Sequence, residues 1–305
     1  MNKITPLHKR GDPWFDDGNI VLVPEDSSIA FKVHRDFLSR HSEIFKSMFE
    51  LPTPTSEVPL LDDCQVVPMY DLPFELSNLI KALYDGTGPL EDFLYTAGIL
   101  RLSTKYFITR LRIQAIQHLV QTTSHIHMSI LYMSSTSLGR TNVQVIIPSV
   151  LYFLTLYHLS DLLSGNHVKL QVDHPSCPSA DLSPQDLQAY TIMYQERIQI
   201  ILRFIRHTCG ERTAVHGCQS SVTCTKAFTR VSSRLSRTWR VRTGPLSYMV
   251  QVSDEVAEHD GICGPCKRPF RQDVTTLRED IWRRLPSVVG MSSWEELTKN
   301  DMPKP

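Results

Sequence analysis

The chain has 305 residues, of which 41% are hydrophobic and 21% are charged. This length accommodates about two domains, and the composition is that of a globular protein rather than of a disordered chain. The 32 Lys and Arg residues balance 32 Asp and Glu residues. No overall charge therefore draws the chain to nucleic acid or to acidic lipid.

The beginning of the chain lacks the apolar run of a secretory signal. The most apolar stretch, residues 143–159, contains Pro148 and His158 and is shorter than the roughly 20 residues that cross a bilayer. We therefore expect no membrane partner and a cytoplasmic or nuclear localisation. In such a reducing compartment the seven cysteines are expected to be free thiols or metal ligands rather than disulfides.

The N-terminal third predicts a small α+β domain after a flexible segment, residues 1–13. Residues 19–24 are rich in β-branched side chains and residues 29–34 alternate, which predicts a β-hairpin. An apolar stripe over residues 37–49 predicts a helix that is interrupted between Ser39 and Ser42. Further elements are expected in this order: short strands at 58–61 and 66–72, and helices at 73–84, 91–102 and 107–122.

One motif runs from the second strand of this hairpin into the helix. It has the form F-x-V/A-H-R/K-x-x-L-x-x-x-S-x-x-F-x-x-M-F, and its positions are occupied by Phe31, Val33, His34, Arg35, Leu38, Ser42, Phe45, Met48 and Phe49. With residues 83–86 (Leu-Tyr-Asp-Gly), the segment 14–122 resembles a BTB/POZ domain. The resemblance implies a short mixed sheet capped by helices. The apolar motif residues are expected in the core, and His34 is expected to form a structural hydrogen bond.

The resemblance also implies partners. BTB domains bind other proteins, by self-association in many cases and by docking to a cullin scaffold in others. Two features of this sequence depart from those patterns. Pro6, Gly11 and Pro13 interrupt the short segment before the hairpin, and the loop 50–57 lacks the hydrophobic-x-Glu element of many cullin-docking domains. The sequence therefore predicts a protein-binding domain without naming its partner.

The remainder predicts a mainly α-helical C-terminal domain over residues 123–300, followed by a flexible tail, residues 301–305. Ser183, Pro184 and Asp186 form a strong helix start. The expected helices cover about 143–163, 184–209, 225–240, 246–258 and 274–285. Segments in this half, 217–224, 262–266 and 281–297, are similar to the C-terminal part of uncharacterised fungal BTB proteins.

Four cysteines form two close pairs, Cys218 with Cys224 and Cys263 with Cys266. Two such pairs supply the four thiolates of a tetrahedral structural zinc site, with Gly264 and Pro265 bending the second pair around the metal. The alternative is that these are reduced thiols in the core. A third hypothesis is dithiol redox chemistry, because Cys-Gly-Pro-Cys is the thioredoxin tetrapeptide, although no βαβ pattern surrounds it here.

A basic stripe lies downstream of the first cysteine pair, formed by Lys226, Arg230, Arg234 and Arg237 at helical spacing. It predicts a solvated helix face, with binding of nucleic acid as the alternative. The sequence contains no phosphate-binding glycine loop, G-x-S-x-G or H-E-x-x-H motif. We therefore expect a non-enzymatic interaction or adaptor protein, with a zinc-stabilised nucleic-acid-associated regulator and a thiol oxidoreductase as the competing hypotheses.

Overall fold

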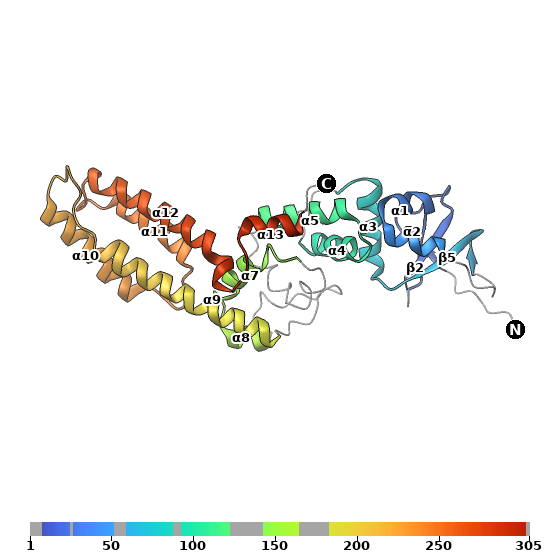
Figure 1. Ribbon diagram of the computed structural model, residues 1–305, viewed down its shortest axis with the longest axis horizontal. Coiled ribbons are helices and arrows are strands. Elements are labelled where there is room, and N and C mark those ends of the chain that lie inside the picture. Colours follow the sequence, from blue (N-terminus) through green and yellow to red (C-terminus); the bar gives the residue numbers. More distant parts are fainter. Residues whose placement is uncertain are drawn as a thin grey trace. The chain divides into compact units, whose positions relative to one another are not determined.

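The structure is a computed structural model that describes residues 8–24, 27–51, 59–87, 93–122, 143–164 and 183–302. The chain forms two compact units. The first is built mainly from residues 1–129 and the second mainly from residues 144–171 and 179–305. Figure 1 shows the mixed strands and helices of the first unit and the helices of the second.

A five-stranded mixed sheet organises the first unit, in the order β1-β3-β2-β5-β4. The predicted hairpin is confirmed, because β2 pairs antiparallel with β3, with Ile20 opposite Val33. β5 runs parallel to β2 and antiparallel to β4. The strand bounds are Lys9–Arg10 for β1, Ile20–Pro24 for β2, Ile29–Val33 for β3, Leu60–Leu61 for β4 and Cys64–Met69 for β5.

Strand β1 extends the sheet beyond the predicted hairpin. Its Lys9 N–H donates to the Ser28 carbonyl at 2.6 Å, and the following Gly11 N–H donates to the Ala30 carbonyl at 2.8 Å. The segment was expected to be flexible up to residue 13, and this expectation is wrong from Lys9 onward. Such edge pairing uses backbone groups, so the side-chain pattern gave no sign of it.

Five helices of the first unit are described. Their bounds are Arg35–His41 for α1, Glu43–Glu50 for α2, Pro73–Tyr84 for α3, Phe93–Lys105 for α4 and Thr109–Thr122 for α5. The predicted interruption is confirmed at Ser42, which lies between α1 and α2. The Ser42 hydroxyl accepts the Phe45 N–H at 3.0 Å and donates to the Tyr106 carbonyl at 2.5 Å. This one side chain therefore begins α2 and fixes it to the end of α4.

The regular secondary structure described in the second unit is all helical. In Figure 1, the helices α9 to α12 lie along one another in a long bundle. The bounds are Ile147–Leu154 for α7, Leu159–Ser164 for α8, Pro184–Arg203 for α9, Phe204–Gly210 for the π-helix η2, Ser221–Thr238 for α10, Pro245–Glu258 for α11, Gly264–Val288 for α12 and Trp294–Asp301 for α13. The main core of this unit consists of buried side chains from α9, η2, α10, α11 and α12.

Three expectations for this unit are corrected. The single helix expected over 143–163 is two helices, because the chain turns between Thr155 and His158 before α8 begins. Helix α12 begins at Gly264 rather than at 274, since proline is accepted near a helix start and Pro265 lies there. Asp301 does not belong to a flexible tail: it is buried, and its carboxylate accepts the N–H groups of residues 144 and 145 at 2.7 and 2.6 Å.

The apolar stretch around α7 is buried, as its composition predicted. Within the described ranges, no helix combines the length and the apolar character that crossing a membrane requires.

Candidate functional site

The apolar motif residues of the first unit form its core. Phe31, Val33, Leu38, Phe45 and Phe49 are buried, and Met48 is half-buried. The ring of Phe45 stacks on that of Tyr106 with the centroids 4.5 Å apart. These side chains therefore join the hairpin and the first two helices to α4, which is a packing role.

His34 lies where β3 meets α1 and takes part in a polar and aromatic cluster. Its ring Nδ1 is 3.0 Å from the Tyr84 hydroxyl, which also accepts the His34 backbone N–H at 3.0 Å. The other ring nitrogen is 3.2 Å from a carboxylate oxygen of Asp17. The Tyr84 ring stacks with both Phe15 and Phe37, at 4.2 and 4.1 Å between centroids. The cluster ties the hairpin to the end of α3, and its described contacts include no Ser or Cys nucleophile.

Two exposed aromatic side chains of the first unit belong to chain segments that are hydrogen-bonded to one another. Tyr70 is 71% exposed and Phe107 is 65% exposed. Their chain neighbours are bonded together: the Lys105 ammonium donates to the Tyr70 carbonyl at 3.3 Å and to the Asp71 carboxylate at 2.7 Å, and Tyr106 also bonds Asp71. We call Tyr70 and Phe107 the aromatic pair. The sequence alone does not reveal this pair, because exposure depends on the tertiary structure.

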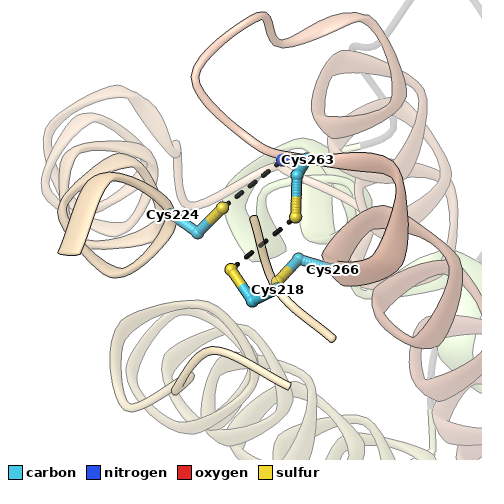
Figure 2. A group of neighbouring side chains, drawn as sticks. All are labelled: Cys218, Cys224, Cys263 and Cys266. Atoms are coloured by element: carbon cyan, nitrogen blue, oxygen red, sulfur yellow. Dashed lines mark hydrogen bonds between the residues drawn. The ribbon is translucent and has the colours of Figure 1, made fainter. Parts of the chain in front are cut away.

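The second unit brings the four predicted cysteines into one cluster, shown in Figure 2. The four sulfur atoms all lie within 4.8 Å of one another. The Sγ atoms of Cys218 and Cys263 are 3.7 Å apart, which is too long for a disulfide bond of about 2.05 Å. All four are free thiols. We call this group the four-cysteine cluster.

The first two cysteines are positioned by a turn and by the start of a helix. The turn ends with Cys218, whose backbone N–H donates to the Val215 carbonyl at 3.1 Å. Gly217, just before it, has φ +81°, a conformation that side chains other than glycine rarely adopt. Cys224 lies in the first turn of α10 and is buried. The segment between Cys218 and Cys224 therefore leads from a turn into the start of α10, which is why this pair is more widely spaced than Cys263 and Cys266.

The other two cysteines lie at the N-terminus of α12. Cys263 is the N-cap residue, and Cys266 follows in the first turn. Gly264 and Pro265, which were expected to bend this pair around the metal, are the first two residues of the helix. The Cys263 backbone N–H also donates to Cys224 Sγ at 3.4 Å, so a main-chain group already joins the two pairs (Figure 2).

The thiols of the cluster differ in how readily they lose a proton. A backbone hydrogen bond from Gln219 lowers the pKa of Cys263 to about 6. Burial raises the pKa of Cys218 to about 12 and also raises that of Cys266. Thiolates this close repel one another, so a full set of four requires a cation among them.

The distances fit a tetrahedral thiolate site. Four sulfurs at about 2.3 Å from a zinc ion lie about 3.8 Å from each other, close to the 3.7 Å between Cys218 and Cys263. Other candidate ligands considered from the sequence, Cys209 and the histidines 207, 216 and 259, do not belong to this group of described residues. The four cysteines could thus hold a metal ion on their own.

The basic stripe lies on the exposed face of α10. Lys226, Arg230, Arg234 and Arg237 are all exposed. Arg234 forms an ion pair with Glu255 of α11. The described residues show no aromatic side chain interleaved with the stripe, so its geometry is that of a solvated face and the nucleic-acid hypothesis stays a prediction.

Comparison with known proteins identifies the first unit. A family model described as BTB/POZ domain matches residues 16–123. No match was found among curated proteins.

Proposed function

Residues 16–123 form a BTB/POZ domain, and from this premise we propose that the chain is a non-enzymatic interaction protein that binds another protein through the aromatic pair. BTB domains mediate protein–protein interactions generally. The observation that carries the proposal is the 71% and 65% exposure of Tyr70 and Phe107. Large aromatic side chains that are exposed in one chain and become buried on binding contribute much of the affinity of protein interfaces.

The backbone at Phe107 supports this role. Its φ is +50°, a left-handed conformation that is rare for a bulky side chain. The residues on either side hold it there: Tyr106 is buried against Phe45, and the Ile108 N–H donates to the Ser103 carbonyl at 2.8 Å. The ring is thus presented on a fixed backbone, which lowers the entropy that binding costs.

Replacement of the aromatic pair tests this proposal. We would compare the full chain with Tyr70→Ser/Phe107→Ser and with Leu60→Ser, which changes an exposed apolar residue of β4 in the same unit. Proteins enriched from cells would be quantified, the best partner purified, and its affinity measured; sedimentation of the chain alone would report self-association. We expect the double variant to bind about 10–30-fold more weakly and Leu60→Ser to bind as the parent does.

Any of three partners would support the proposal if its binding depends on the aromatic pair: a second copy of the chain, a cullin scaffold or another protein. Self-association, a cullin scaffold and another protein are distinguished by sedimentation and by the identity of the enriched protein. Equal affinities for the parent and the double variant would contradict the role of the aromatic pair. The absence of both a partner and self-association would contradict the interaction function.

We propose further that the four-cysteine cluster holds one structural zinc ion. The proposal rests on four thiols within 4.8 Å of one another, contributed by a turn and by the starts of α10 and α12. Zinc prefers such closed thiolate sets in structural sites. A metal there would join segments about 40 residues apart in the chain and would supply the positive charge that the thiolates need.

Cobalt substitution tests the ligand set. Cobalt(II) bound by four thiolates in a tetrahedron has intense charge-transfer and visible bands that zinc then removes. We expect these bands in the parent and in Cys209→Ala, whose cysteine is buried in the same core outside the cluster. We expect none in Cys263→Ser/Cys266→Ser. Absence of the bands in folded parent protein would contradict the metal site.

The same cysteines also bear on the oxidoreductase hypothesis. Cys263 begins a helix and its pKa is lowered to about 6, which is typical of reactive thiols. However, two further thiols lie within 4.8 Å of it, which favours metal binding over a two-cysteine redox pair. Dithiol reductase activity in the protein as purified, lost in Cys263→Ser/Cys266→Ser, would favour the oxidoreductase instead.

A further inference from the structure

A buried arginine in the second unit has no acidic partner. Arg197 of α9 is only 1% exposed. Among the described residues it forms no ion pair, and the charged or ionisable side chains that influence it are the tyrosines 152, 190 and 194. Burial lowers the pKa of its guanidinium group. A charge held away from water without a counter-ion is costly unless another group binds it.

The guanidinium group is only partly satisfied by the protein. Its Nη1 donates to the Thr243 carbonyl at 3.0 Å. Nε and Nη2 have no hydrogen-bond partner among the described residues. These two nitrogens lie on one edge of the planar group, and their N–H bonds point the same way. This edge is the one that binds both oxygens of a carboxylate or phosphate.

Arg197 lies in the wall of a cavity of about 370 Å³. This volume falls in the range of small-molecule sites. The cavity lies between the α7–α8 turn, α9 and the segment before α11, all within the second unit. Its walls include the rings of Tyr157, Tyr190 and Tyr194 and the side chain of Val241, while Arg242 places a second guanidinium beside it.

The charges of the cavity have one sign. None of the described residues that line it is an aspartate or a glutamate, whereas both Arg197 and Arg242 are cations. With a mainly apolar wall, the field of these cations is poorly screened inside the cavity. The aromatic and aliphatic side chains favour an apolar ligand body, and the unpaired guanidinium edge favours an anionic end. Because its two nitrogens are buried, a neighbouring wall side chain must move aside for an anion to reach them.

We propose that this cavity is a binding site for a small molecule that carries one carboxylate or phosphate group on an apolar body, with Arg197 binding the anionic group. The proposal is independent of the aromatic pair and of the four-cysteine cluster. It assigns a function to Arg197, a deeply buried cation that has no acidic partner among the described residues.

The test uses benzoate, phenyl phosphate and benzamide as probes of the full chain. Benzamide has nearly the shape of benzoate but no charge. Calorimetric titration at constant ionic strength would be carried out on the parent, on Arg197→Met and on Arg203→Met, which removes an arginine of the same helix that pairs with Glu196. We expect at least one of the two anions to bind the parent and Arg203→Met at least 10-fold more tightly than benzamide. We expect this preference to be lost in Arg197→Met. The stronger of the two anions identifies the natural headgroup.

A second variant keeps the test decisive if Arg197→Met does not fold. Val241→Trp fills the cavity from its exposed side and leaves the arginine in place. We expect it to abolish binding of the anionic probe without lowering the melting temperature. Equal affinities for benzoate and benzamide, anion binding that persists in folded Arg197→Met, or no anion binding at millimolar concentration would overturn the proposal.

Discussion

At the scale of single residues, Glu75 and Arg197 show the two ways in which a buried charge is accommodated. Glu75 lies in α3 with its side chain 2% exposed, and Arg101 of α4 pairs with it. Arg197 is buried to the same degree but has only a carbonyl and aromatic rings around it. The first arrangement completes a core, whereas the second leaves hydrogen-bond donors for a ligand.

Removal of one member of the Glu75–Arg101 pair tests the structural role of this charge. We expect Arg101→Met to lower the free energy of unfolding by about 3–5 kcal/mol, because it leaves a carboxylate buried without a partner. Urea denaturation would measure this loss. In Arg101→Met/Glu75→Gln the loss should be much smaller. Arg283→Met, which breaks an exposed pair with Asp280, should cost less than about 1 kcal/mol. A loss for Arg101→Met no larger than this control would refute the assignment.

The residues of the candidate sites differ in how far the sequence predicts them. The close spacing of the cysteines predicted the four-cysteine cluster, because metal sites reuse short chain segments. Arg197 follows Tyr190 and Met193 on the buried face of α9, so the helical spacing alone could have placed this cation in the core. The exposure of Tyr70 and Phe107 could not be predicted, since it depends on which segments pack over them.

At the scale of elements, the sequence predicted correctly those features that depend on interactions between residues close together in the chain. The hairpin, the break at Ser42 and the start of α9 follow from alternation and from capping residues. The start of α12 was misplaced, because prolines usually mark a helix boundary: Pro265 lies in the first turn of α12, whereas Pro269 lies inside the helix. Proline lacks an N–H that the first turn of a helix does not use. The edge strand β1 and the turn between α7 and α8 depend on tertiary contacts and gave no local signal.

Ser42 provides a test at this scale. We expect Ser42→Ala to lower the free energy of unfolding by about 1–3 kcal/mol, because it removes the cap of α2 and leaves the buried Tyr106 carbonyl without that hydrogen bond. Ser39→Ala is the matched control, since its hydroxyl only bonds the Arg35 carbonyl within α1. Denaturation curves of the two variants that coincide would contradict the role assigned to Ser42.

At the scale of the whole molecule, the two units are stabilised differently. The first has a sheet whose faces are covered by apolar and aromatic side chains. The second is a helical bundle in which the turn at Cys218 and the starts of α10 and α12 meet at the four-cysteine cluster. A metal ion bound there stabilises the folded bundle by mass action, by about 4 kcal/mol when free metal is about a thousand times the dissociation constant.

Removal of the metal should therefore destabilise the second unit and leave the first unchanged. We expect a zinc chelator to lower the melting temperature and to speed hydrogen exchange in residues 215–224 and 259–268, which carry and flank the cysteines. Exchange in the sheet strands β2, β3 and β5 should not change. Faster exchange in both units to the same extent, or in neither, would contradict a local metal clamp.

The metal content of the full chain is the most direct test of the proposal that a zinc ion clamps the helical unit that follows the BTB/POZ domain. Native mass spectrometry would be applied to protein purified without added zinc, beside Cys263→Ser/Cys266→Ser and Cys209→Ala. We expect one zinc ion per chain in the parent and in Cys209→Ala, and none in the double variant. Folded parent protein without metal, or a double variant that retains its zinc, would contradict the metal clamp.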